Sequence, residues 1–227
     1  MCKGVKTFYK NCNHNQIDQI DQTLTFYRDV AEEIRKQIVC LLENSKYKNE
    51  YSNKSENGKY RYVYTDINLE NIFYRCIQNE KNENTIRIFL GDLRSADPEA
   101  VNSYINNNNR YNKYTFLPFE YSYSQSSDIY FGLTFKSDQS KKLFLSWMIG
   151  ILLLSFIDGN INIYRKNINQ VTDEDHNKNY KKLEKTYGKK LAEYLNSDPE
   201  KRPDINSSLP EINTSLKGER EFFRENK

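Results

Sequence analysis

Apolar residues recur at intervals of three and four along residues 17–41. This spacing predicts an amphipathic helix, because residues three and four apart lie on the same side of a helix. The seam repeats as heptads and consists of Ile17, Ile20, Leu24, Tyr27, Ala31, Ile34, Ile38 and Leu41, widened by Phe26, Val30, Val39 and Leu42. Two interpretations fit the heptads: the helix covers its own domain, or two copies of the chain pair through it as a homodimer.

A second pattern is the almost unbroken apolar run "LFLSWMIGILLLSFI" at residues 143–157. As a helix it would be about 22 Å long, whereas the hydrocarbon core of a bilayer is about 30 Å thick. Lengthening the helix would bring the lysines at 141–142 or Asp158 into lipid. We therefore predict a buried helix of a folded domain, capped by residues 137–138 and beginning near Gln139. A membrane tether is the alternative.

Shorter stretches predict β-strands. Residues 59–66 and 85–92 alternate between apolar and polar side chains, and residues 114–124 and 128–137 are rich in aromatic side chains. Residues 71–77 are short and fit more than one element, of which a strand is favoured. The predicted strands are "KYRYVYTD" (59–66), "NIFYRCI" (71–77), "TIRIFLGD" (85–92), "YTFLPFEYSYS" (114–124) and "DIYFGLTFKS" (128–137). The last two predict an antiparallel hairpin, with Pro118 at an edge or a bulge because proline has no backbone N–H. Before that hairpin, Asp97 and Pro98 predict the start of a short helix that ends near Ile105.

Polar sequence separates and follows these elements. Residues 43–58 predict a loop, and residues 166–177 predict a linker. Residues 179–195 predict an amphipathic helix, weakened by Gly188, whose apolar face holds Tyr180, Leu183, Tyr187, Leu191 and Tyr194. Residues 197–227 contain prolines and few large apolar side chains, and we expect a flexible tail there.

Together these patterns predict an α+β fold. A central, mostly antiparallel sheet would be covered by the long N-terminal helix and by the buried apolar helix, with a flexible polar C-terminal tail. The expected parts are an N-terminal helix (1–46), an α+β core domain (59–165), an amphipathic basic helix (178–196) and the tail (197–227). Residues 159–167 fit either helix or strand.

Composition narrows the class of partner. The 227 residues include 34 basic and 31 acidic ones, a net charge of +3, so no global field favours nucleic acid. The four cysteines form no C-x-x-C pair, and we expect reduced thiols in the cytoplasm. Cys2, Cys12 and His14 lie close in sequence, but without a second pair of ligands they predict no metal site.

The sequence carries no nucleophile elbow, phosphate-binding glycine loop or H-E-x-x-H motif. The two histidines, His14 and His176, lie in polar stretches and are expected to be exposed. Asp92 and Asp97 lie beside Arg94, and such pairs in loops are mostly solvated. We therefore predict a non-enzymatic protein that needs no cofactor.

The segment from Gly91 to Ile157 resembles the second half of a GAF domain, a fold that senses small molecules. "GDLRSADPEAVNSYI" precedes "YNKYTFLPFEYS", then "DIYFGLTFKSDQ", then the apolar helix, in the family's order. The resemblance implies a ligand pocket under the predicted 97–105 helix and a dimer formed through the N-terminal helix. Residues 59–90 do not align with the family's first strands, so the resemblance covers the second half of that fold alone.

Two groups of residues are candidates for binding. Aromatic rings and guanidinium groups could hold an acidic or phosphorylated ligand, and the candidates flanking the predicted short helix are Arg94, Tyr104, Arg110, Tyr111 and Tyr114. Core tyrosines and surface arginines are the simpler interpretation of the same residues. A lysine cluster could contact phosphate or an anionic bilayer, or be a solvated helix face; it comprises Lys178, Lys181, Lys182, Lys185, Lys189 and Lys190.

The sequence thus favours a cytoplasmic, non-enzymatic sensor or regulatory domain that binds a small acidic or phosphorylated ligand and forms a homodimer through residues 17–41. The alternative is a protein that binds a protein partner through its surface and C-terminal tail, such as an immunity, inhibitor or defence-system accessory factor. A membrane-tethered protein is the second alternative. Neither nucleic acid nor a membrane is the expected partner.

Overall fold

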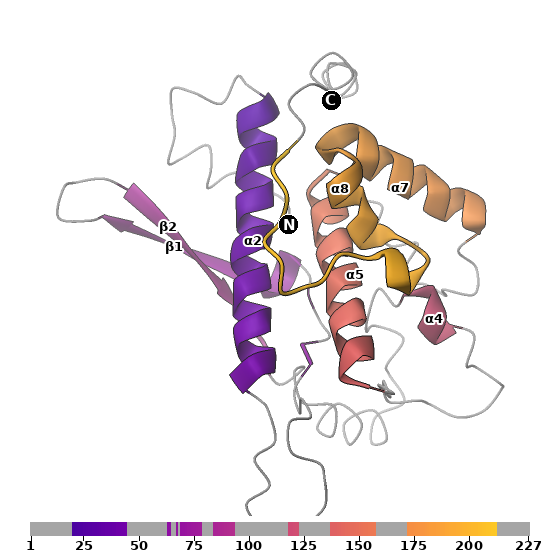
Figure 1. The fold of residues 1–227 in the computed structure, drawn as a ribbon. Helices are drawn as coiled ribbons and strands as arrows, with labels where there is room; N and C mark the ends of the chain where they lie inside the picture. The colour runs from indigo at the N-terminus through magenta and orange to yellow at the C-terminus, as the bar shows by residue number, and fades with distance from the viewer. Residues whose placement is uncertain are drawn as a thin grey trace, which may run out of the picture.

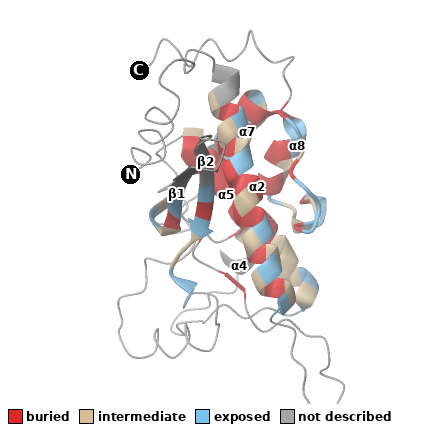
Figure 2. Ribbon diagram, turned by 90° about the vertical axis from the view of Figure 1, so that its left-hand side faces the viewer, coloured by how far each residue is buried: buried red, intermediate tan, exposed pale blue. Residues whose placement is uncertain are grey.

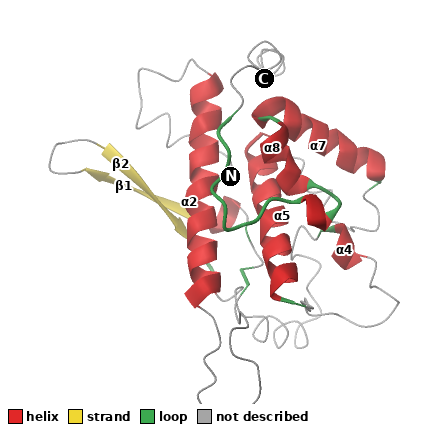
Figure 3. Ribbon diagram, in the orientation of Figure 1, coloured by secondary structure: helices red, strands yellow, loops and turns green. Residues whose placement is uncertain are grey.

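Helices dominate the part of the chain that the structure describes, beside one antiparallel pair of strands (Figure 1). The computed structural model describes residues 20–44, 63–64, 67, 69–78, 84–93, 118–122, 137–157 and 172–212. The fold is α+β, as the sequence predicts (Figure 3). Its elements are α2 (Ile20–Asn44), η1 (Leu69–Asn71), β1 (Ile72–Gln78), β2 (Asn84–Leu90), α4 (Phe119–Ser122), α5 (Asp138–Ile157), α7 (Asp173–Tyr187), α8 (Lys189–Ala192), η4 (Glu193–Leu195) and η5 (Pro199–Lys201).

The predicted N-terminal helix is present as α2, and its heptad seam is buried within the chain. The buried seam residues include Leu24, Tyr27, Val30, Ala31, Ile34, Ile38 and Leu42. Tyr27 stacks on Phe156 of α5, with ring centroids 4.8 Å apart and planes inclined by 3°. The seam therefore covers its own domain. A homodimer formed through the same helix stays a prediction.

The apolar run forms α5, and it lies at the centre of the described core. Ser137 caps the helix: its hydroxyl oxygen accepts a hydrogen bond from the backbone N–H of Ser140, at 3.0 Å. Residues 144–156 are all buried (Figure 2). Among the described helices, α5 alone has the length and hydropathy to cross a bilayer, but 78% of its apolar window is buried inside the protein. The predicted burial of this segment is confirmed.

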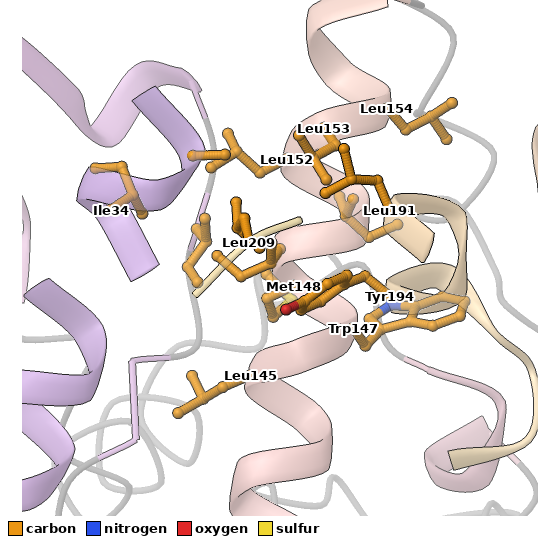
Figure 4. Packing of buried hydrophobic residues seen from close by; sticks show 14 of the residues in the cluster. Ile34, Leu145, Trp147, Met148, Leu152, Leu153, Leu154, Leu191, Tyr194 and Leu209 are labelled. Carbon is orange, nitrogen blue, oxygen red and sulfur yellow. The ribbon is translucent and has the colours of Figure 1, made fainter. Parts of the chain in front are cut away.

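Side chains of α5 extend to both sides of the helix, toward Ile34 of α2 and toward Leu191 and Tyr194 of the C-terminal elements (Figure 4). Gly150 lies close to the backbone of η4. A Cβ atom there would lie 2.8 Å from the backbone nitrogen of Leu195 and 2.8 Å from the carbonyl carbon of Tyr194. Glycine at this position therefore lets η4 pack directly on α5.

Two of the predicted strands are confirmed as β1 and β2. They pair antiparallel in a register that sets Phe73 opposite Phe89 and Arg75 opposite Arg87. The pair lies on one side of α2, so that α5 rather than the sheet occupies the centre (Figure 1). The Gln37 side chain of α2 donates to the carbonyl of Ile88 at 2.7 Å and accepts from the N–H of Leu90 at 2.9 Å. It thereby covers the outer edge of β2, as a third strand would.

The basic helix begins earlier than predicted. Thr172 caps α7 by accepting a hydrogen bond from the N–H of Asp175, and α7 then runs through residues expected to be a linker, 173–177. The linker prediction is wrong there because a threonine cap followed by acidic residues in the first turn stabilises a helix start. The helix ends at Gly188, which has a φ of 98°.

Residues 202–212, here called the C-terminal strap, pack against the helices. Figure 1 shows the strap in yellow, between α2 and α5. Its apolar residues Ile205, Leu209 and Ile212 are buried. The prediction of a flexible tail is wrong for this segment, because three well-placed apolar side chains and hydrogen bonds from α2 offset the cost of ordering it. Residues 213–227 lie outside the described residues.

Polar side chains of α2 bind the backbone of the C-terminal strap. Arg28 donates to the carbonyls of Leu209 and Pro210. Arg35 donates to the carbonyl of Ile205 at 2.8 Å, and Glu32 accepts from the N–H of Leu209 at 2.9 Å. The strap therefore finds partners for backbone groups that have no ladder or helix of their own.

Two strand predictions are wrong where the structure tests them. Val63 and Tyr64 are buried but lie in no strand. Residues 119–122 form α4 where a strand was expected; Pro118 supplies no N–H to a ladder, and Glu120 in the first helical turn binds Arg202. The remaining predicted elements lie outside the described residues: 59–62, 65–66, 97–105, 114–117, 123–124, 128–136, 159–167 and the loop from 45 to 58.

Candidate functional site

The ligand-binding residues predicted from the sequence lie outside the described residues. They are Arg94, Tyr104, Arg110, Tyr111 and Tyr114. The same is true of Asp97, His14, Cys2 and Cys12. A sensor pocket therefore stays a prediction.

His176 is buried, so the prediction of an exposed side chain is wrong. Its ring stacks on Trp147 with centroids 5.7 Å apart, and the edge of Phe119 meets it at 4.8 Å. Burial and, to a smaller extent, the charge of Arg202 lower the pKa of His176 to about 4, although Asp173 acts in the opposite direction. The imidazole is consequently neutral at neutral pH.

Arg202 completes this group of side chains, which we call the aromatic clasp and define as Phe119, Glu120, Trp147, His176 and Arg202. The guanidinium of Arg202 donates to both carboxylate oxygens of Glu120, at 2.6 and 2.8 Å, and lies 4.9 Å from the centre of the Trp147 ring. The clasp joins α4, α5, α7 and the start of the C-terminal strap. Arg202 and Trp147 are buried at the centre of the clasp, whereas Phe119 is half-buried and Glu120 is exposed at its edge.

A second buried ion pair lies between α2 and the C-terminal strap. Arg35 binds both oxygens of Glu32, at 2.8 Å each. Burial opposes ionisation of Glu32, but hydrogen bonds from Arg35 and from the backbone of Leu209 lower the pKa of its carboxyl below the usual range. Burial likewise raises the pKa of the neighbouring Tyr194 to about 12. These groups hold the strap on the helix and are not open to solvent.

The hairpin of β1 and β2 differs from the rest of the described surface. Large apolar side chains elsewhere are mostly buried, yet Phe73 is 56% exposed and Phe89 is 45% exposed. The cross-strand register puts these two rings opposite each other. Arg75 and Arg87 form the next exposed pair on the same side, because alternate residues of a strand share a face. We call these four residues the hairpin face.

The hairpin face is held on a fixed base. The opposite side of the two strands contributes Ile72 and Ile88 to the core. The N–H of Gly91 donates to the carbonyl of Asn71 at 2.7 Å, and the Tyr64 hydroxyl donates to the carbonyl of Gly91 at 2.5 Å. With the Gln37 contacts to β2, these bonds fix the root of the hairpin and therefore the direction in which the face points.

Sequence reasoning predicted both strands but missed the hairpin face. Its signal is a mirrored pattern, F-x-R in "FYR" and R-x-F in "RIF", on two consecutive strands. In an antiparallel pair, mirrored patterns place like residues opposite each other. The pattern therefore predicts one aromatic pair and one arginine pair on a single face once the register is known.

The lysine cluster forms an exposed side of α7 and α8. Lys178, Lys181, Lys185, Lys189 and Lys190 are exposed. Tyr187 of the predicted apolar face is buried, and Tyr180 of the same face is half-buried. Without exposed aromatic rings to stack on a ligand, this side has the character of a solvated helix face. Binding of phosphate or lipid to it stays a prediction.

No group of three or more metal-binding side chains occurs among the described residues, and the described thiol of Cys40 is exposed and free. Comparison with protein-family models, with curated proteins and with solved structures gave no match.

Proposed function

We propose that this is a non-enzymatic binding protein that engages a protein partner through its hairpin face. The observation that supports the proposal is the exposure of Phe73 and Phe89 as a cross-strand pair. Large exposed apolar groups that lie together are typical of interaction sites rather than of ordinary surface. The sensor function predicted from the GAF resemblance rests on residues 94–114, which the structure does not describe.

Composition and geometry of the hairpin face both fit an interface. Aromatic residues and arginine are enriched at the energetic centres of interfaces. Covering the exposed half of each phenylalanine ring would contribute roughly 1 kcal/mol. The fixed root of the hairpin lowers the entropy lost on binding, because the face needs no ordering when the partner arrives.

The non-enzymatic part of the proposal is supported by the roles of the buried titratable groups. His176, Glu32 and Arg35 each join separate elements of the fold. Catalytic groups must reach a substrate in a cleft. In this fold, these three groups are instead occupied by structural contacts.

A photo-crosslinking experiment followed by reconstitution tests the proposal. A photoreactive benzoylphenylalanine replaces Phe89 in cells that naturally make the protein, and the same probe at Lys181 of α7 serves as the control position. The protein crosslinked only from position 89 is purified and titrated calorimetrically with the intact chain and with a Phe73→Ser/Phe89→Ser variant. We expect the variant to bind at least about ten-fold more weakly while unfolding at an unchanged temperature. Equal affinity for both chains would reject the proposal.

A further inference from the structure

We infer that the hairpin face recognises an extended protein segment in which a large apolar residue and an acidic residue lie two positions apart. The inference rests on the proposed function and adds the chemistry of the partner. It follows from the arginine pair and from its position relative to the phenylalanine pair.

Arg75 and Arg87 lie directly opposite each other and are both exposed. Like charges at opposed positions of a ladder are destabilising. Neither guanidinium has a hydrogen bond or ion pair with another described residue. The α-carbons of opposed strand residues are about 4.5–5.5 Å apart, so both guanidinium groups can reach one anionic group. A carboxylate on the partner would relieve the repulsion and accept several charge-assisted hydrogen bonds.

The distance between the two pairs specifies the order of residues in the partner. The phenylalanine pair lies two residues from the arginine pair along each strand, which is roughly 7 Å. In an extended segment, side chains on one side recur at this same spacing. One apolar side chain can therefore cover Phe73 and Phe89 while an aspartate or glutamate two positions away meets the guanidinium groups.

Two other occupants fit the observations less well. A second copy of the chain docking through the same face would bring four guanidinium groups together, since the four residues of the face include no carboxylate. A single-stranded nucleic acid could stack on the rings, but the net charge of +3 provides no extended positive field to hold its backbone. The structure therefore favours an acidic and apolar protein segment.

A random-peptide library displayed on phage provides the test. The intact chain is immobilised as the target, and an Arg75→Glu/Arg87→Glu variant serves as the counter-target. We expect enriched peptides to share a large apolar residue two positions from Asp or Glu. Synthetic copies should bind the intact chain, and should lose about ten-fold in affinity toward Arg75→Gln/Arg87→Gln or when their acidic residue becomes an amide. Circular dichroism verifies that each variant is folded.

Each result of the selection that differs from this expectation contradicts a specific part of the inference. Enriched peptides that lack an acidic residue but still require Phe73 and Phe89 would overturn this inference and leave the proposed function standing. Peptides whose binding is unchanged when the four residues of the hairpin face are substituted would overturn both this inference and the proposed function. Failure to enrich any peptide would overturn the inference. Tight binding of a labelled single-stranded oligothymidine, lost in Arg75→Gln/Arg87→Gln, would assign the face to nucleic acid instead.

Discussion

The ring of His176 lies against the ring of Trp147, with centroids 5.7 Å apart and planes inclined by 22°. This contact joins the first turn of α7 to the middle of α5. A neutral imidazole suits such a site because a charged one would be buried next to the Arg202 guanidinium. The stacking therefore ties the stability of the fold to the protonation state of one side chain.

Acidification should destabilise the protein through His176. Its pKa is about 4 in the folded chain against an ordinary value of 6.5. Between these values the unfolded chain binds more protons than the folded one, so the free energy of unfolding falls as pH falls. The contribution of neutral His176 to the free energy of unfolding is complete above about pH 6.5, and about 3 kcal/mol of it is lost by pH 4. Urea unfolding measured at several pH values across this window checks the slope.

The variant His176→Phe is the control for this pH dependence. Phenylalanine keeps a ring against Trp147 but cannot take up a proton. We expect its stability to change much less between pH 6.5 and pH 5 than that of the intact chain, whatever its absolute value. An identical slope in the two proteins would show that another group is responsible.

Replacing Arg202 by alanine should destabilise the fold strongly. The Arg202 side chain is completely buried and binds both oxygens of Glu120, which would be left without its partner. We expect a loss of about 2–4 kcal/mol in the free energy of unfolding. The adjacent Lys201→Ala is the matched control, because the ion pair of Lys201 with Asp198 is exposed, and it should cost less than about 0.5 kcal/mol. Similar losses in both would contradict the role of the clasp.

Glu32 and Glu33, which are neighbours on α2, should differ sharply in their contribution to the free energy of unfolding. Glu32→Gln removes the charge that balances buried Arg35 and weakens the bond to Leu209, and we expect a loss of about 2–4 kcal/mol. Glu33→Gln affects only an exposed pair with Lys36 and should change stability by less than about 0.5 kcal/mol. Chemical denaturation of the two variants makes the comparison. If Glu32→Gln were as stable as Glu33→Gln, the C-terminal strap would not depend on α2 in the way described.

Gly150→Ala should destabilise the protein, although alanine is the better helix former by about 1 kcal/mol. The added methyl group would lie within 2.9 Å of backbone atoms of Tyr194 and Leu195, which cannot rotate away. Forcing the two elements apart should cost about 2 kcal/mol or more. Ser155→Ala in the same helix removes a hydroxyl that donates to the carbonyl of Leu152 and should cost about 1 kcal/mol or less. Thermal and urea unfolding distinguish the two.

The sequence predicts what depends on local periodicity. The seam of α2 is visible because its apolar residues recur at intervals of three and four, and α5 is visible because a helix buried on all sides is apolar throughout. Strand β2 is visible because apolar and polar residues alternate along it, whereas β1 is short and lacks a clear alternation. The hairpin face could also have been found, since the mirrored F-x-R and R-x-F patterns require only the antiparallel register.

What the sequence does not reveal depends on partners far away in the chain. The C-terminal strap is polar, and it is ordered by side chains such as Glu32, which lies 177 positions before Leu209. His176 lies in a run of charged and polar residues, and nothing in that run indicates that position 176 faces the core. Phe119–Ser122 has the aromatic composition of a strand, and only Pro118 and the distant Arg202 favour a helix.

The position of the C-terminal strap also sets the order of events during synthesis. The ribosome makes α5 first and the strap roughly fifty residues later. Contacts between the two, such as the hydrogen bond from Ser146 to the carbonyl of Pro203 across 57 positions, can form only after that. Until that point the nascent chain carries its most apolar helix without a full cover. Chaperones and the membrane-insertion machinery both recognise exposed apolar segments of this kind. We therefore expect a chaperone to shield α5 until translation has released the C-terminal strap.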